Sequence, residues 1–433
     1  MSTIKSKLAK FKPPRLPLAN SPKTDTKTAI LALDIGTEYI KAVIAAPTKK
    51  HTLEIVGVGR AHQDANNMYA GAISDISGVV AVCEEALSIA ENQAGLISKQ
   101  TVVGIAGELI KGSTSTIRYH RSNGNKPITE AEMLQIIKKI QERAGAIARK
   151  EVATETDNPA VEVRLINSAI VSLQIDGYKI NNPIGFKGSE LLIQFYTAFA
   201  PLVHISAIEK VCAELNLDLI AVAVEPFAVC RACLGDNLDS NFSAVVMDIG
   251  GGTTDLAIVD DGGVEGTKMF GIGGRSFTHQ IAQRLGTDFT AAEKIKLATD
   301  LSRLQPAMRA KVDQAISDNL EIWLSGVQLA IEDFSALEVI PPRILLCGGG
   351  ASLLELQEAL ATTDWYQDLA FPRRPVVHVV EPEDIPGIIN TTDTALDQSY
   401  ITAFGLLRVA LDTLIGVPEG TGLKTRIAKI LQN

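Results

Sequence analysis

Two stretches of the chain share one pattern of hydrophobic and polar positions. Residues 28–47 read TAILALDIGTEYIKAVIAAP, and residues 244–263 read AVVMDIGGGTTDLAIVDDGG. Each has an apolar run, the triplet Asp-Ile-Gly, a threonine and a second apolar run, which predicts two strands joined by a tight turn. The aspartates of the two triplets, Asp34 and Asp248, are 214 residues apart. A repeat of this kind indicates a duplicated domain.

Strand and helix patterns that do not repeat the first unit lie between these stretches. Residues 101–107 read as a strand, and a helix is predicted from a capping box formed by Thr129 and Glu132. Its apolar positions recur at helical spacing, at Met133, Ile136, Ile137 and Ile140. Two strand patterns follow, on either side of the turn NNPIGFKG at 181–188. Residues 101–199 are therefore expected to form an inserted α+β unit.

The second half alternates strands, glycine loops and helices. From residue 263 we expect a strand, a glycine loop and the start of a helix, and over 291–338 we expect helices. A strand, a glycine loop and a helix are expected again from residue 343, and a last helix is expected over 401–414. The pattern predicts eight segments: a flexible basic tail (1–27), domain I (28–100 and 200–243), the insertion (101–199), the domain II core (244–290 and 341–415), a small helical subdomain (291–340), and a linker with an amphipathic helix (416–433).

Charge is spread unevenly over the 433 residues. The whole chain carries −9, residues 1–27 carry +6 and residues 418–433 carry +2, which leaves −17 for residues 28–417. An acidic body argues against nucleic acid as a partner, whereas two basic tails suit an anionic membrane surface. No apolar run reaches the roughly 18 residues of a membrane-spanning helix, and no signal peptide is seen, so a cytosolic protein is expected. The five cysteines show no disulfide pattern.

The residues between the apolar runs suit phosphate binding. Glycine lacks Cβ, so the main-chain amides at such a hairpin tip can approach a phosphate closely. An aspartate at each tip, Asp34 and Asp248, can hold a hydrated Mg²⁺ that offsets the charges of both carboxylate and phosphate. Taken alone, the second stretch could be a plain glycine-rich hairpin. The repeat of the same pattern at Asp34 argues against this alternative. We therefore expect two facing tips that clamp the phosphates of a nucleotide.

Other features are weaker signals of the same site. Gly348-Gly349-Gly350 lies between a strand and a helix, where a tight turn is the usual interpretation. Gly273-Gly274 precedes a helix whose first amides are expected to donate to phosphates. Glu293 and Lys296 share a helix face, where a solvated ion pair is common.

Five segments together resemble the actin-like ATPases. The phosphate-one, connect-one, phosphate-two, adenosine and connect-two segments are similar to DIGTEYIKAVIA, EPFAVCRACL, DIGGGTTDLAIV, ILLCGGGASL and ITAFGLLRVA, in this order. The position of the insertion, and its Asn-Pro-Ile-Gly turn at 182–185, resemble the bacterial FtsA cell-division family. The resemblance implies an α/β actin-like fold: duplicated ribonuclease H-like domains around a nucleotide cleft, with an inserted α+β subdomain.

The resemblance also implies a role for each candidate residue. ATP with Mg²⁺ is the implied ligand, with Asp34 and Asp248 facing the metal. Fifteen residues are implied for the nucleotide: Asp34, Gly36 and Thr37 in the first phosphate loop, Gly250, Gly251, Gly252 and Thr253 in the second, Gly273 and Gly274 beside the phosphates, Glu293 and Lys296 at the ribose, and Gly348, Gly349, Gly350 and Ala351 at the adenosine.

Three departures from the family pattern change the expectations. Glu38-Tyr39 stands where the family has Ser-Lys, which places an acid beside the phosphates and predicts an ATPase that is weak at most, with no catalytic residue assigned. Gln280 replaces an aspartate. The segment after Lys296 lacks the strand pair of the subdomain that, in the family, receives the tail of the tubulin-like partner FtsZ.

The final residues resemble the family's membrane-targeting helix. In GLKTRIAKILQN, Leu423, Ile427, Ile430 and Leu431 share one face, and Lys424, Arg426 and Lys429 are directed to lipid head groups. A frayed helix, or one packed on the body, is the alternative. IKSKLAKFK, near the first residue, is a second and weaker candidate anchor.

Three functions remain open. The first is a polymerising, ATP-binding scaffold that links FtsZ to the inner face of the membrane, with itself, the FtsZ C-terminal tail and anionic lipid as partners. The second is a cytosolic adaptor of type IV pilus assembly, similar to PilM, which the reduced small subdomain favours. The third is a small-molecule kinase, for which no segment supplies a substrate pocket with a catalytic base.

Overall fold

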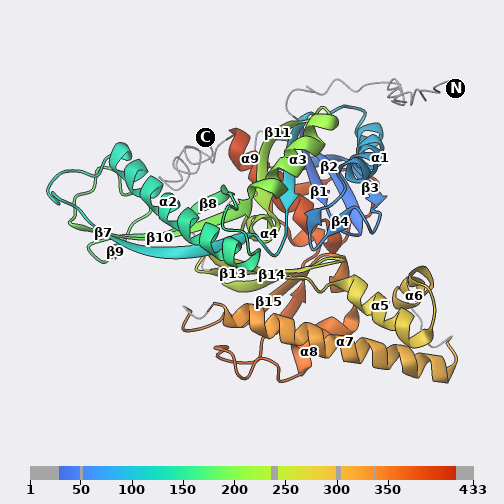
Figure 1. The fold of residues 1–433 in the computed structure, drawn as a ribbon. Helices are drawn as coiled ribbons and strands as arrows, with labels where there is room; N and C mark the ends of the chain where they lie inside the picture. Colours follow the sequence, from blue (N-terminus) through green and yellow to red (C-terminus); the bar gives the residue numbers. More distant parts are fainter. Residues whose placement is uncertain (1–28, 49–51, 236–241, 299–303, 335–336, 416–433) are drawn as a thin grey trace, which may run out of the picture.

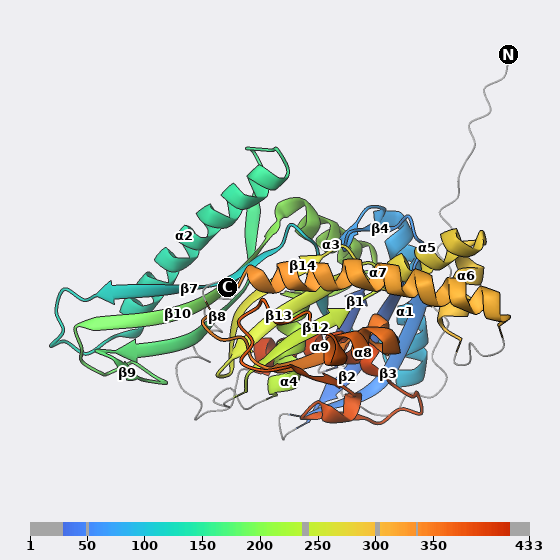
Figure 2. The ribbon, with the colours of Figure 1, turned by 90° about the horizontal axis from the view of Figure 1, so that it is seen from below.

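The computed structural model describes residues 29–48, 52–235, 242–298, 304–334 and 337–415. Figure 1 shows two halves, one above the other, and a unit that projects to one side. The upper half contains the blue strands of the N-terminal region, and the lower half contains the yellow and orange helices. In Figure 2, which views the molecule from below, the projecting unit again extends away from both halves.

The first sheet forms the centre of the upper half. All six residues of β1 (Ile30–Ile35) are buried, because layers of the protein cover both faces of this strand. It pairs antiparallel with β2 (Tyr39–Pro47) and parallel with β6 (Gln100–Ile105). The strand order is β11 (Asp218–Val224), β6, β1, β2, β3 (Leu53–His62) and β17 (Ile388–Asn390).

The second sheet repeats this arrangement. β12 (Ala244–Ile249) pairs antiparallel with β13 (Thr254–Asp260) and parallel with β15 (Arg343–Cys347). β14 (Gly263–Phe270) continues the sheet beside β13, and β16 (Val376–Val379) continues it beside β15. Five strands in each half therefore share one order and one set of directions. This repetition agrees with the duplication that the two Asp-Ile-Gly stretches predict.

Alternate residues of β12 reach two different cores. Ala244 and Val246 belong to the cluster that fills the upper half, whereas Val245 and Met247 belong to the cluster beneath the second sheet. Successive side chains of a strand point to opposite faces, so a strand between two cores must be apolar at every position. This explains the unbroken apolar run in AVVM.

The inserted unit extends the second sheet. Its strands are β7 (Lys111–His120), β10 (Glu190–Pro201), β8 (Val163–Ile175) and β9 (Tyr178–Lys179), and β7 pairs with β14. The predicted boundary at residue 101 is wrong, because the strand at 101–105 is β6 of the first sheet. A buried parallel strand has the same apolar pattern in either sheet, so the pattern did not distinguish them. The insertion begins after Ile105.

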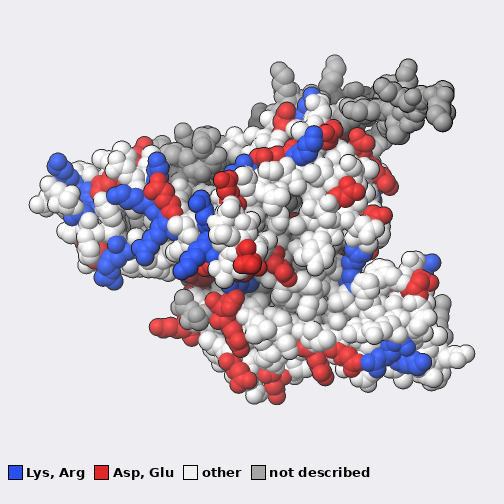
Figure 3. All heavy atoms as spheres, viewed as in Figure 1, with Lys and Arg blue, Asp and Glu red and all other residues white. Residues whose placement is uncertain are grey.

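Helix α2 (Glu130–Glu155) covers the inserted strands, and all four of its predicted apolar residues are buried. Thr129 caps the helix by accepting from the amide of Glu132 at 3.2 Å. The carboxylate of Glu132 does not return to the cap as a capping box requires; it pairs with Arg121 at 2.8 Å. Figure 3 shows Lys and Arg side chains gathered over this unit.

The remaining helices pack against the two sheets. The upper half holds α1 (Ile76–Ala94), α3 (Leu202–Glu214), α4 (Glu225–Leu234) and α9 (Ile401–Ile415). The lower half holds α5 (Gly274–Leu285), α6 (Phe289–Lys296), α7 (Pro306–Glu332) and α8 (Leu354–Thr362). α9 packs on α4 and β1, so the last described helix returns to the upper half. The helices predicted near 291–338 and 401–414 are confirmed.

Short elements complete the fold. They are the ribbon of β4 (Met68–Tyr69) and β5 (Ala72–Ile73), and the 3₁₀ turns η2 (Gly349–Ser352), η3 (Pro382–Asp384) and η4 (Gln398–Tyr400). All five cysteines are free thiols. Among the helices in the described ranges, none has the length and apolar character that crossing a membrane demands.

Candidate functional site

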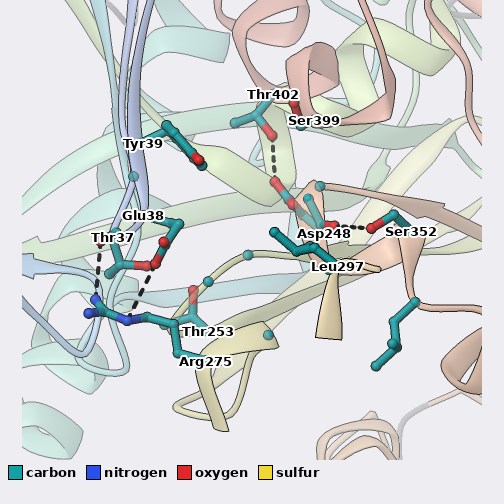
Figure 4. A pocket seen from close by; sticks show the side chains of 18 of the residues that line it. Thr37, Glu38, Tyr39, Asp248, Thr253, Arg275, Leu297, Ser352, Ser399 and Thr402 are labelled. Carbon is teal, nitrogen blue, oxygen red and sulfur yellow. Dashed lines mark hydrogen bonds and ion pairs between the residues drawn. The ribbon is translucent and has the colours of Figure 1, made fainter. Parts of the chain in front are cut away.

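Both Asp-Ile-Gly tips line one cavity of about 840 Å³. Asp34 lies at the end of β1 and Asp248 at the equivalent position of β12. Figure 4 shows this cavity from close by, with Asp248 beside Thr402 on one side and Thr37 and Glu38 on the other. Two aspartates that are far apart in the sequence therefore share one cavity between the two halves.

The other predicted nucleotide residues also gather here. Of the fifteen, all but Gly252, Gly273 and Ala351 line the cavity. Those three lie directly beside lining residues: Gly252 is in the second loop, Gly273 precedes α5, and Ala351 is buried in η2. The predicted membrane residues Leu423, Lys424, Ile427, Ile430 and Leu431 lie outside the described residues.

The glycines of the second loop allow the two loops to touch. A Cβ on Gly251 would lie 2.9 Å from Cβ of Glu38, and one on Gly252 would lie 3.1 Å from Cγ2 of Thr37. The amide of Gly252 donates to Oγ1 of Thr37 at 2.9 Å. The glycine triplet therefore serves close packing between the halves, which the sequence alone did not indicate.

Several amides of the two loops are open, which means that they have no hydrogen-bond acceptor among the residues that the structure describes. Within the described ranges, the amides of Thr37, Glu38 and Gly251 donate to no protein acceptor. Buried or half-buried amides are normally paired, so open amides at the rim of a cavity suit an anionic ligand. These three donors come from both loops, as a clamp on phosphates requires.

The start of α5 has a different role from the expected one. The amides of Gly274 and Arg275 donate to the carbonyls of Gly250 and Gly251, at 2.9 and 2.8 Å. The expectation that the Gly274 amide is free for a phosphate is therefore wrong. The physical reason is that the first amides of a helix have no partner inside the helix, and here they hold the carbonyls of the second loop.

The floor of the cavity is strongly acidic. Burial raises the pKa of Asp248, although Thr402 donates a hydrogen bond to its carboxylate and Lys41 also lowers the pKa. Burial raises the pKa of Asp255 well above its usual range, and the neighbouring Asp248 raises it further. Burial likewise raises the pKa of Glu225, with Asp34 as the next cause. These carboxyls resist ionisation unless a cation approaches.

Lys41 places a positive charge against Asp34. Its Nζ lies 2.8 Å from Oδ2 of Asp34. Burial by itself would lower the pKa of Lys41, but the charge of Asp34, the hydrogen bond to Asp34 and the charge of Asp248 together raise this pKa. The two therefore form a buried ion pair.

The side of the cavity opposite the first loop carries a second polar cluster. Nζ of Lys296 lies 2.9 Å from Glu293 and 2.8 Å from the hydroxyl of Thr278, which also bonds to Glu293. The solvated pair that helix spacing suggests is thus partly buried, and it borders the cavity. Gly348, at φ 83°, leaves room for Asp248, because a Cβ there would lie 2.1 Å from Oδ1 of Asp248.

Sequence reasoning did not identify several lining residues. Lys41 and Asp255 each stand seven positions after the tip aspartate and directly opposite it in the hairpin, so strand register is a signal that could have found them. Glu225 opens the connect-one helix. Arg275 and Thr402 come from other elements, and no local pattern indicates them.

The geometry shows a carboxylate pair, not a complete metal cluster. Within the described ranges, no group of three or more His, Cys, Asp or Glu side chains is arranged to hold a metal ion. The expectation for Mg²⁺ was a hydrated ion held by Asp34 and Asp248, which needs fewer direct protein ligands.

Two repeated halves, with both acidic tips on one cavity, define an actin-like fold. The PilM–PilN type IV pilus biogenesis complex contains a chain of the same fold: the TM-score is 0.63 at 17% identity, over 88% of this chain and 98% of that one. This similarity confirms the predicted fold class.

In sequence, the chain is similar to the cell division protein FtsA. Residues 245–405 match the family model for cell division protein FtsA. The chain is 25% identical to FtsA of Pseudomonas aeruginosa, over 88% of this chain and 89% of that protein. It is 27% identical to FtsA of Neisseria meningitidis serogroup B, over 93% and 98%. The chain is thus similar to FtsA proteins over most of its length, as its motifs predicted.

Proposed function

We propose that this chain is an ATP-binding, actin-like protein of bacterial cell division. The observation that carries the proposal is the shared cavity, in which the two acidic tips and the open amides of both loops face one another. The relationship to FtsA supports the cell-division role. The fifteen predicted residues are the proposed nucleotide contacts, apart from the Gly274 amide, which is already bonded within the protein.

The acidic floor fits a magnesium ion. Burial raises the pKa values of Asp248, Asp255 and Glu225, so a nearby dication would favour their ionised forms. Asp34 and Asp248 would hold the hydrated ion. When bound, Mg²⁺ would neutralise part of the charge on the phosphates.

The nucleotide proposal is tested with a fluorescent ATP analogue and Mg²⁺. We expect saturable binding by the full chain and at least about tenfold weaker binding by Asp248→Ala, because a charged ligand contact is lost. The matched control is Glu209→Gln, which removes the charge that Glu209 of α3 presents to Arg164 in an exposed ion pair. This variant should bind as the unmodified chain does. Equal binding by Asp248→Ala would reject the metal role of this residue.

Polymerisation at the inner face of the membrane is the second part of the proposal. Its support is the relationship to FtsA, together with the apolar and basic faces of GLKTRIAKILQN in the sequence. ATP binding would favour the closed shape of the protomer that joins a filament. The FtsZ C-terminal tail is the proposed protein partner.

Sedimentation with anionic liposomes, followed by electron microscopy, tests this part. With ATP and Mg²⁺ we expect the full chain to pellet and form filaments on the vesicles. Deletion of 421–433 should abolish pelleting, and unchanged pelleting would reject the C-terminal residues as the anchor. Zwitterionic vesicles are the control, since basic residues gain little from them.

The pilus adaptor remains the second candidate. It is favoured by the helical small subdomain: between Phe289 and Glu332 the described residues form helices α6 and α7 and contain no strand. Binding of an FtsZ tail peptide, measured by fluorescence anisotropy, separates the two candidates. An adaptor of pilus assembly should ignore that peptide and form no filaments.

A further inference from the structure

The first phosphate loop carries an acid that contacts the other half of the molecule. Oε2 of Glu38 lies 3.4 Å from Nε of Arg275, and Nη1 of Arg275 donates to the carbonyl of Thr37 at 3.3 Å. Figure 4 shows both contacts as dashed lines. Oε1 of Glu38 lies 3.1 Å from His62. One guanidinium thus spans the two halves at the mouth of the cavity.

These contacts are long for a charged pair. Charge-assisted hydrogen bonds are usually about 2.7–2.9 Å, and an arginine that fits its anion well binds it through two parallel bonds. Here Arg275 makes one contact to the carboxylate and one to a carbonyl, and both side chains keep 20% of their surface exposed. A better anion can therefore displace Glu38 from Arg275.

The open amides lie beside this pair. Thr37 and Glu38 themselves carry two of the open amides, and Gly251 carries the third, with its ideal Cβ 2.9 Å from Cβ of Glu38. A phosphate held by these amides would meet the carboxylate of Glu38, which repels it. The same phosphate would lie within the reach of Arg275, whose planar guanidinium matches phosphate oxygens.

The two lysines of the cavity have closer partners. Lys41 lies 2.8 Å from Asp34, and Lys296 lies 2.8 Å from Thr278 and 2.9 Å from Glu293. Arg275, with its longer contacts, is more readily released than either lysine.

We infer that Arg275 distinguishes a nucleoside triphosphate from a diphosphate, and that Glu38 competes with the terminal phosphate for the guanidinium of Arg275. The terminal phosphate takes the guanidinium from Glu38, whereas a diphosphate leaves the pair in place. Because Arg275 also bonds to the carbonyl of Thr37, the exchange changes a contact between the halves, which links phosphate number to their relative position. This inference rests on the proposed nucleotide site.

The experiment measures dissociation constants of fluorescent ATP and ADP, both with Mg²⁺, for the full chain, three test variants and one control variant. For Arg275→Gln we expect ATP to bind about tenfold weaker and ADP to change little, since a charged hydrogen bond to the terminal phosphate is lost. Glu38→Gln should bind ATP several-fold more tightly, because the competing charge is gone. The double variant should regain most of the ATP affinity that Arg275→Gln loses. Glu209→Gln is again the control.

Each outcome decides the inference. A ratio of ADP to ATP affinity that stays the same in Glu38→Gln overturns it, even if Arg275→Gln does not fold. Equal losses for ATP and ADP in Arg275→Gln also overturn it, since they indicate a structural role. If the unmodified chain binds neither nucleotide, the proposed nucleotide function is wrong, and the inference is wrong with it. If the unmodified chain binds nucleotide and the variants behave as just described, the inference alone is wrong. Thermal unfolding without nucleotide shows which variants are folded.

Discussion

The two hairpins occupy equivalent places but balance their charge in opposite ways. In the first, Asp34 stands opposite Lys41, and the two form a buried ion pair. In the second, Asp248 stands opposite Asp255, so a second acid takes the place of the lysine. Asp248 instead receives a hydroxyl hydrogen bond from Thr402.

Because of this difference, the two hairpins should respond differently to a bound cation. The first hairpin is neutralised by its own sequence, whereas the second gathers acids whose pKa values burial raises. A bound dication is thus expected to stabilise the second hairpin more than the first. Four substitutions test this comparison, from the largest expected effect to the smallest.

Replacing Lys41 with Met should make the first hairpin resemble the second. Asp34 would remain buried without its cation, next to three other acids, which should lower the free energy of unfolding by about 3 kcal/mol. Urea unfolding at neutral pH measures the loss. Adding Mg²⁺ should restore more stability to this variant than to the unmodified chain. Lys268→Met breaks an exposed pair with Asp333 and should cost less than about 0.5 kcal/mol. Equal losses in both variants would contradict the buried-pair account.

Replacing Gly348 with Ala should disturb the second hairpin, at Asp248 and at the neighbouring carbonyl of Ile249, which would lie 2.5 Å from the new Cβ. The new Cβ would lie 2.1 Å from Oδ1 of Asp248, at a φ of 83° that alanine tolerates poorly. We expect a loss of about 2 kcal/mol in stability, together with weaker nucleotide binding. For stability, the neighbouring Gly349→Ala is the matched control, because nothing lies within 4 Å of its Cβ. Similar thermal shifts in the two variants would show that Asp248 is not confined in this way.

Thr402→Val tests the hydrogen bond that replaces the ion pair in the second half. The carboxylate of Asp248 would lose its hydroxyl donor, and its pKa should rise further. A stability loss of about 1.5 kcal/mol at neutral pH is expected, as for hydrogen bonds to charged groups. The loss should shrink at acidic pH, where Asp248 is protonated. A loss that is independent of pH would assign the effect to packing.

Asp255→Asn tests the acidic partner through the pH dependence of stability. Burial raises the pKa of Asp255 above its ordinary value of 3.8. Its favourable contribution is therefore present below about pH 3.8 and is lost as pH rises through the raised pKa. Without Mg²⁺, the variant should lose less stability than the unmodified chain between acidic and neutral pH. Parallel curves in chemical unfolding would mean that Asp255 titrates normally.

The local pattern predicted the parts of the site that are made by one hairpin at a time. Asp34 and Asp248 could be found because each interrupts an apolar run in the same way, and the shared strand order placed them together. Lys41 and Asp255 stand opposite these aspartates in the strand register, which the pattern of apolar runs does not contain.

Contacts between distant elements could not be predicted. Thr402 reaches Asp248 across 154 residues, and the Gly274 amide meets a carbonyl of the second loop only after both halves fold. The boundary at residue 101 was wrong for a related reason, since sheet membership depends on which neighbour a buried strand finds.

The most direct test of the central claim is a crystal structure with a non-hydrolysable ATP analogue and Mn²⁺, which replaces Mg²⁺ and scatters anomalously. The account predicts one Mn²⁺ peak between Asp34 and Asp248, with the phosphates on the amides of Thr37 and Gly251. A nucleotide bound outside this cavity, or phosphates there with no metal between the two aspartates, would contradict it.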